Sequence, residues 1–151
     1  MKRVIASVLI LAAILLLPGC SNRGTRPYRD LAVSDIVSAE VLLQPPDKTL
    51  KIEDIGVLVE LLRDVAIYEI DNTYSEYAGQ AVTFNLTMSD VTKTIITEYN
   101  PFIIIDGAGY RAESDPCTAL STYANGLLDS ADTLVAVSYT HLISACQTGR
   151  R

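Results

Sequence analysis

Cys117 is a cysteine whose position in this 151-residue chain could make its thiol reactive. It follows Pro116 in the first turn of a predicted helix, where the helix N-terminus lowers the pKa of a thiol and makes it a better nucleophile. The alternative is a small buried side chain that packs as a hydrophobic residue. Cys117 is therefore a candidate reactive thiol, although we favour the buried interpretation.

A second group of candidates lies in and beside the polar stretch DNTYSEYAG, residues 71–79. Tyrosines next to acids and amides can stack on a peptide or a glycan and form hydrogen bonds with it. The alternative is ordinary amphipathic tyrosine at strand edges. The stretch lacks the acidic spacing and the glycine of a calcium loop, so we expect no metal site there. The candidate ligand contacts are Tyr68, Tyr74, Glu76 and Tyr77.

The chain contains no GxSxG, Walker loop, HExxH, CxxC or GxGxxG motif, so we expect no cofactor and no catalytic activity. Two carboxylates alone can hydrolyse a glycoside. However, residues 30–129 hold 17 acidic side chains, and so many acids form pairs by chance. Five basic residues in the same span leave a net charge of −12. A domain this acidic repels phosphate backbones, so we expect no nucleic-acid partner.

The N-terminus has the pattern of an export signal. A basic start, residues 1–3, precedes an apolar run, residues 4–17, that is shorter than the ~20 residues a spanning helix needs. Leu17-Pro18-Gly19-Cys20 resembles the lipobox of bacterial lipoproteins, with Pro18 as a departure from the usual residue. The resemblance implies cleavage after residue 19 and acyl chains on Cys20 that anchor the protein to the outer face of the cell membrane. The alternative is a plain secretory peptide with a chance cysteine.

Residues 20–32 follow as the predicted lipid anchor and tether. They are polar and rich in Gly, Pro, Ser and Asn up to Arg29, with no apolar period. Three arginines would lie beside anionic headgroups: Arg23, Arg26 and Arg29.

The only histidine, His141, and a further cysteine, Cys146, lie in the C-terminal stretch AVSYTHLISACQTGRR, residues 136–151. VSYTHL within it resembles the translation of the transposon end used as a sequencing-library adapter. The alternative is a natural β-strand over residues 134–142. The resemblance implies that residues 130–151 are an unstructured or artefactual tail. His141 and Cys146 then carry no functional weight, and Cys117 has no disulfide partner.

Strand and helix patterns alternate in the remaining part, residues 33–129. Apolar residues at every second position predict a strand over 82–88, and apolar residues at helix spacing predict a helix over 53–64. Asp115-Pro116 begins a second helix. We predict an α+β domain, a small antiparallel sheet of about five to six strands with two helices packed on one face. The further strands expected are 36–43, 49–52, 66–70, 94–99, 102–105 and 110–112.

Residues 36–128 also resemble a small uncharacterised domain of exported Firmicutes proteins, through DIVSAEVLLQPPDKT, EYAGQAVTFNLT and YNPFIIIDGAGY. The resemblance implies a cell-surface location and brings no catalytic motif. We therefore expect a lipid-anchored extracytoplasmic binding module of the bacterial cell envelope, whose ligand is an envelope protein or a glycan. The alternative is an accessory or sensory domain that regulates a membrane protease or sensor. A carboxylate-dependent envelope hydrolase ranks last.

Overall fold

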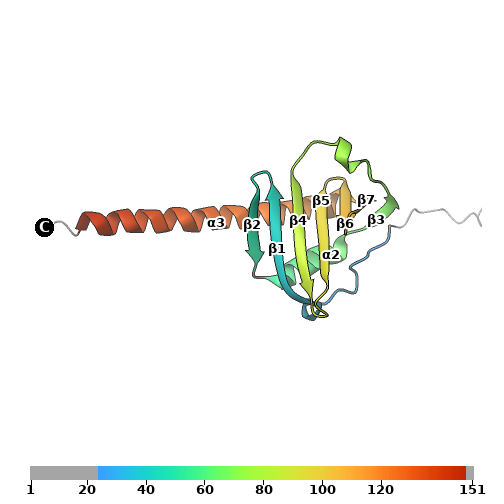
Figure 1. Cartoon of the computed structure of the whole chain (residues 1–151), viewed down its shortest axis with the longest axis horizontal. Helices are drawn as coiled ribbons and strands as arrows, with labels where there is room; N and C mark the ends of the chain where they lie inside the picture. The colour runs from blue at the N-terminus through green and yellow to red at the C-terminus, as the bar shows by residue number, and fades with distance from the viewer. Residues whose placement is uncertain (1–23, 149–151) are drawn as a thin grey trace, which may run out of the picture.

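Seven antiparallel strands form one sheet, and two α-helices cover one of its faces (Figure 1). The computed structural model describes residues 24–148, and the side chains of residues 24–133. The predicted α+β class and the position of both helices on one face are confirmed. The sheet has seven strands, more than the five to six expected, because all seven of the predicted strand segments pair into the same sheet.

The strand order is β2-β1-β4-β5-β6-β7-β3, so the sheet is not a simple meander along the chain. β4 to β7 pair in succession, while β1 lies beside β4 and β3 pairs with the far side of β7. β2 and β3 therefore form the two edges. The strands are β1 (Ile36–Gln44), β2 (Lys48–Ile52), β3 (Ile67–Ile70), β4 (Ala81–Met88), β5 (Lys93–Tyr99), β6 (Phe102–Ile105) and β7 (Ala108–Ala112).

The first helix, α2 (Ile55–Asp64), begins two residues later than expected. The Asp54 carboxylate accepts a hydrogen bond from the Val57 amide at 3.2 Å, which makes Asp54 the N-cap. Its buried stripe is Leu58, Val59 and Leu62, as the helix spacing predicts. Two short 3-10 helices complete the domain, η1 (Val33–Asp35) and η2 (Thr73–Glu76).

The second helix, α3 (Ser114–Thr148), is longer than expected. Residues 130–148, which we expected to be an unstructured or artefactual tail, are helical, and they do not form the alternative strand. No proline follows Pro116, so nothing in the backbone chemistry ends the helix early. The side chains of His141 and Cys146 lie outside the described part of the chain. The resemblance of this stretch to an adapter therefore stays a prediction.

The core lies between the helices and the face of the sheet that they cover. Alternate residues of the central strands point into it, so that Phe84, Leu86 and Ile96 are almost fully buried. Leu120 and Ala124 of α3 close the core from the other side. The opposite face of the sheet, which we call the open face, carries the intervening residues of the same strands.

Part of the predicted tether is packed onto the domain, which corrects the expected boundary at residue 32. Thr25 forms an isolated antiparallel bridge with Ile67 of β3, with hydrogen bonds of 2.7 and 2.8 Å. Tyr28 and Leu31 pack against the core, and burial raises the pKa of the Tyr28 hydroxyl. The unpaired edge of β3 attracts this segment, because its backbone groups need partners. We call residues 25–31 the strap.

Cys20 and the predicted signal peptide lie outside the described residues. Among the helices that are described, none is both long enough and apolar enough to cross a bilayer.

Candidate functional site

A pocket of about 410 Å³ lies on the open face of the sheet, beside η2. Three tyrosines surround it. Two come from residues 71–80, which we call the η2 segment, and one comes from β5. All of its lining side chains are neutral. We call this the tyrosine pocket, and its lining residues are Tyr74, Ser75, Tyr77, Ala81, Thr97, Tyr99 and Ile104.

The floor of the pocket follows from strand register. Thr97 of β5 is paired with Ile104 of β6, and Tyr99 is paired with Phe102. Residues two apart on a strand share a face, so these four side chains point to the open face, while Glu98 and Ile103 between them point to the core. The pairing therefore places a flat, mostly apolar surface under η2.

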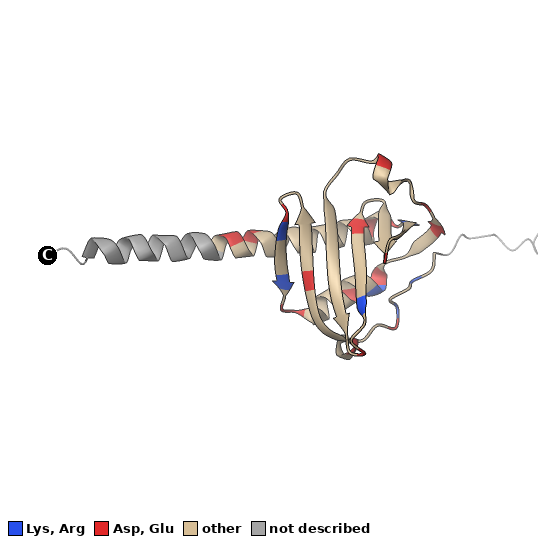
Figure 2. Ribbon diagram, viewed as in Figure 1, with Lys and Arg blue, Asp and Glu red and all other residues tan. Residues whose placement is uncertain are grey.

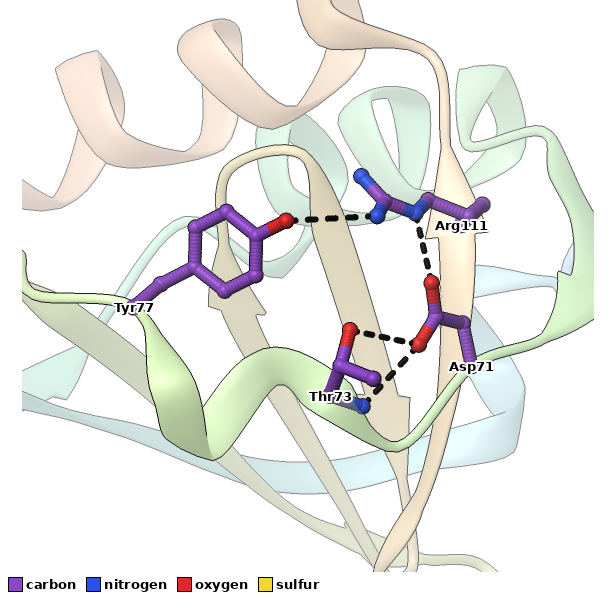
Figure 3. A network of polar contacts seen from close by, with 4 residues as sticks. All are labelled: Asp71, Thr73, Tyr77 and Arg111. Carbon is purple, nitrogen blue, oxygen red and sulfur yellow. Dashed lines mark hydrogen bonds and ion pairs between the residues drawn. The ribbon is translucent and has the colours of Figure 1, made fainter.

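The wall of the pocket is the η2 segment. Hydrogen bonds of Asp71 fix the position of the beginning of this segment (Figure 3). The Asp71 carboxylate accepts hydrogen bonds from the Thr73 amide at 2.9 Å and from the Thr73 hydroxyl at 2.7 Å. Its other oxygen accepts one from Arg111 Nε at 2.7 Å. The Thr73 hydroxyl, the Thr73 amide and the Arg111 guanidinium lower the pKa of Asp71 to about 2. Asp71 is therefore ionised at any physiological pH.

Gly109 of β7 allows this segment to approach the sheet. A Cβ at Gly109 would lie 2.6 Å from the Asp71 carbonyl oxygen and 2.7 Å from the Tyr74 ring. The Gly109 amide donates to the Asn72 side chain at 2.9 Å, and its carbonyl accepts from the Asp71 amide at 2.9 Å. Only glycine leaves room for this close contact.

Phe102 anchors the tyrosines from below. The rings of Tyr74 and Tyr77 meet it edge-on, at centroid distances of 6.4 and 5.0 Å. The Arg111 guanidinium lies 4.4 Å from the centre of the same ring and reaches the Tyr77 hydroxyl at 3.4 Å (Figure 3). The Tyr99 hydroxyl donates to the Tyr77 carbonyl. These contacts hold the rings in a fixed arrangement before any ligand arrives.

The structure brings together two of the four predicted contact residues. Tyr74 and Tyr77 line the pocket. Glu76 is exposed in η2 and is not part of the lining. Tyr68 lies on β3, where its hydroxyl donates to Glu113 at 2.7 Å, outside the pocket.

Sequence reasoning missed Thr97 and Ile104, which line the pocket from β5 and β6. Alternation along the predicted strands contained part of the signal, since it separates Thr97 and Tyr99 from the core residues Ile96 and Glu98. The missing part was the pairing of β5 with β6, which places Ile104 beside Thr97.

Cys117 is fully buried and belongs to the core. Burial, with a smaller effect of the Glu98 carboxylate, raises the pKa of its thiol to about 12. The helix N-terminus does not offset this desolvation, so the thiolate is absent at neutral pH. The structure supports the buried interpretation over the reactive thiol.

Glu98 is the carboxylate that the structure singles out, since only 1% of it is exposed. One oxygen accepts a hydrogen bond from the Asn100 amide at 2.9 Å, and the other accepts one from the Ser121 hydroxyl. Burial raises the pKa of this carboxyl group against the effect of both bonds. General acid or base chemistry requires contact with substrate, which this enclosure prevents. Glu98 instead connects β5 to α3.

The tyrosine pocket can bind a neutral molecule by ring stacking and hydroxyl contacts, and it holds no ionised group with which to do proton transfer. Among the side chains of residues 24–133, no three His, Cys, Asp or Glu groups gather as metal ligands. In comparisons with known proteins, no family model, no curated protein and no solved structure matched this chain.

Proposed function

We propose that this chain is a lipid-anchored binding module of the bacterial cell envelope, which holds its ligand in the tyrosine pocket. The observation that carries the proposal is the joint placement of Tyr74, Tyr77 and Tyr99 around one pocket on the open face. Tyrosine supplies large contact area with little loss of conformational entropy, which suits a recognition surface. No catalytic step belongs to the proposal.

The chemistry of the lining supports a neutral ligand, either a glycan or an uncharged part of an envelope protein. Seven neutral side chains offer aromatic rings, methyl groups and hydroxyls, and both glycans and peptides use these contacts. Arg111 and Asp71 neutralise each other behind the Tyr77 ring, so they add rigidity and no net charge.

The location in this proposal rests on the sequence. The lipobox-like residues 17–20 support an anchor of acyl chains on Cys20, at the outer face of the cell membrane. The domain itself then faces the envelope, where glycans and proteins are both present.

Replacement of Tyr77 by alanine tests the pocket. Tyr77 is 47% exposed, so the change removes a ring from the pocket with little loss of core packing. The probes are an N-acetylglucosamine oligomer and a detergent extract of envelope proteins, each passed over the immobilised domain. We expect one probe to be retained by the unmodified domain, and Tyr77→Ala to weaken its binding by about tenfold or more, as for other tyrosine hot spots.

Tyr68→Ala is the matched control, since it removes a tyrosine that lies outside the pocket. It should bind the same probe as well as the unmodified domain does. The proposal is wrong if neither probe is retained, or if Tyr77→Ala and Tyr68→Ala change binding equally.

A further inference from the structure

An apolar groove runs between α2 and the first turns of α3, on the opposite side of the domain from the tyrosine pocket. Two adjoining hollows, of about 540 and 330 Å³, share Leu61, Asp115 and Ala119. The apolar part of the lining comes from both helices. We call this the helix groove, and its apolar residues are Val57, Leu61, Pro116, Ala119 and Tyr123.

These apolar side chains lie at the margin of the core: Leu61 and Tyr123 pack partly against it, and each keeps part of its surface outside. The buried stripe of α2 is Leu58, Val59 and Leu62, and Val57 lies beside it with 39% of its surface exposed. Leu61 is half-buried and completes an apolar strip along the outer side of α2. A contiguous apolar surface rimmed by polar residues is a characteristic feature of contact sites for other molecules.

The rim of the groove is acidic. Asp64, Glu113 and Asp115 line it, and Arg26 of the N-terminal segment is the only basic residue among the lining side chains. Arg26 lies 3.7 Å from Asp64, and both side chains are largely exposed. An exposed ion pair of this kind contributes little stability, so another cation can replace Arg26 at low cost. Figure 2 shows acidic residues along both helices, with few basic residues near them.

We propose that the helix groove binds a cationic amphipathic helix of a partner protein. Val57 and Leu61 lie about one turn apart on α2, a rise of about 6 Å, and Pro116 to Tyr123 span about 10 Å along α3, which matches about two turns of a third helix. Such a helix would place apolar residues at i, i+3, i+4 and i+7 against the groove, and lysines or arginines on its flanks against the acidic rim.

The charge of the groove argues against two other occupants. An anionic membrane surface would be repelled by Asp64, Glu113 and Asp115. A second copy of the chain would present the same acidic domain, with its net charge of −12 over residues 30–129. The groove does not depend on the tyrosine pocket, so this inference and the proposed function can fail separately.

The probe is a synthetic helical peptide of about four turns, with leucines at i, i+3, i+4 and i+7 and lysines at its other positions. A scrambled peptide of the same composition controls for simple charge attraction. We expect the amphipathic peptide to bind the unmodified domain at least about tenfold more tightly than the scrambled one, measured by titration calorimetry at physiological salt.

Val57→Lys removes apolar surface from the groove and adds a repelling charge, so it should weaken peptide binding by about tenfold or more. Val37→Lys is its matched control, because Val37 is exposed to 68% on β1, outside the groove. Asp115→Asn should weaken binding by a few-fold and reduce its dependence on salt. Urea unfolding of each variant confirms that it is folded. The inference is overturned if the peptide does not bind, if the scrambled peptide binds equally well, or if both lysine variants behave alike.

Discussion

Glu98 shows how one buried residue can serve structure without serving chemistry. Its carboxyl group is buried in the domain. The burial is tolerated because the Ser121 hydroxyl and the Asn100 amide both donate hydrogen bonds to it. A buried acid without such partners would cost several kcal/mol. The residue beside it in the core, Cys117, is likewise inert, since the same apolar surroundings raise its pKa to about 12.

Glu98→Gln should change how stability depends on pH. Burial raises the pKa of Glu98 above its ordinary value of 4.5, so the folded protein holds a proton that the unfolded chain releases. The free energy of unfolding therefore falls as pH rises from about 4.5 through the raised value. Glutamine does not titrate, so the variant should lose less stability between pH 4.5 and pH 7, measured by urea unfolding.

Glu40→Gln, at an exposed position on β1, is the control and should keep the pH dependence of the unmodified protein. An unchanged pH dependence in Glu98→Gln would contradict the proposed position of this carboxylate.

The η2 segment is the element that makes the site, and its position depends on β7 rather than on its own sequence. Asp71 and Asn72 both bond to the Gly109 backbone, and Asp71 also pairs with Arg111. The segment has few residues in the core, so these contacts determine where the tyrosines lie. A substitution on β7 should therefore change the positions of the tyrosines in the pocket.

Gly109→Ala should lower the free energy of unfolding by about 1–3 kcal/mol, because the new methyl group overlaps the Asp71 carbonyl and the Tyr74 ring. It should also increase amide hydrogen exchange in residues 71–79, since the segment must move away from the sheet. Both effects are measured on the purified domain, by urea unfolding and by exchange mass spectrometry.

Gly126→Ala is the matched substitution, in the interior of α3, where a new Cβ would contact nothing within 4 Å. It should raise stability by up to about 1 kcal/mol, since alanine favours a helix over glycine. If Gly109→Ala is as stable as Gly126→Ala, the close packing of η2 on β7 is wrong.

The two ends of the described chain lie on opposite sides of the domain (Figure 1). The described chain begins beside β3, whereas the C-terminal part of α3 extends away from the sheet on the other side (Figure 1). Because the strap holds residues 25–31 on the domain, only residues 21–24 separate it from Cys20, a span of at most about 17 Å. An anchor at Cys20 would therefore keep the β3 edge close to the bilayer.

Cys20→Ser should release the protein from membranes into the soluble fraction, because it removes the thiol that would carry the diacylglycerol. The measurement is fractionation of cells followed by immunoblotting. Cys117→Ser is the control, since that thiol is buried in the core, and the variant should stay with the membranes. Membrane association of Cys20→Ser, or release of Cys117→Ser, would count against the lipid anchor.

The sequence alone determined the features that depend on neighbouring residues. Alternation predicted β4, and helical spacing predicted α2. It also located the tyrosine-bearing segment at 71–79. These inferences hold because side-chain direction repeats every two residues in a strand and about every 3.6 in a helix, whatever the rest of the chain does.

Only the tertiary structure decided what depends on pairing between distant segments. It placed β3 beside β7 and β1 beside β4, added the strap to the sheet edge, and separated Tyr68 from Tyr74 and Tyr77. It also showed that Glu98 is buried, although nothing in the sequence distinguishes it from the other acidic residues among the 17 in residues 30–129. The physical reason is register: a shift of one residue in a strand pairing moves every side chain to the other face.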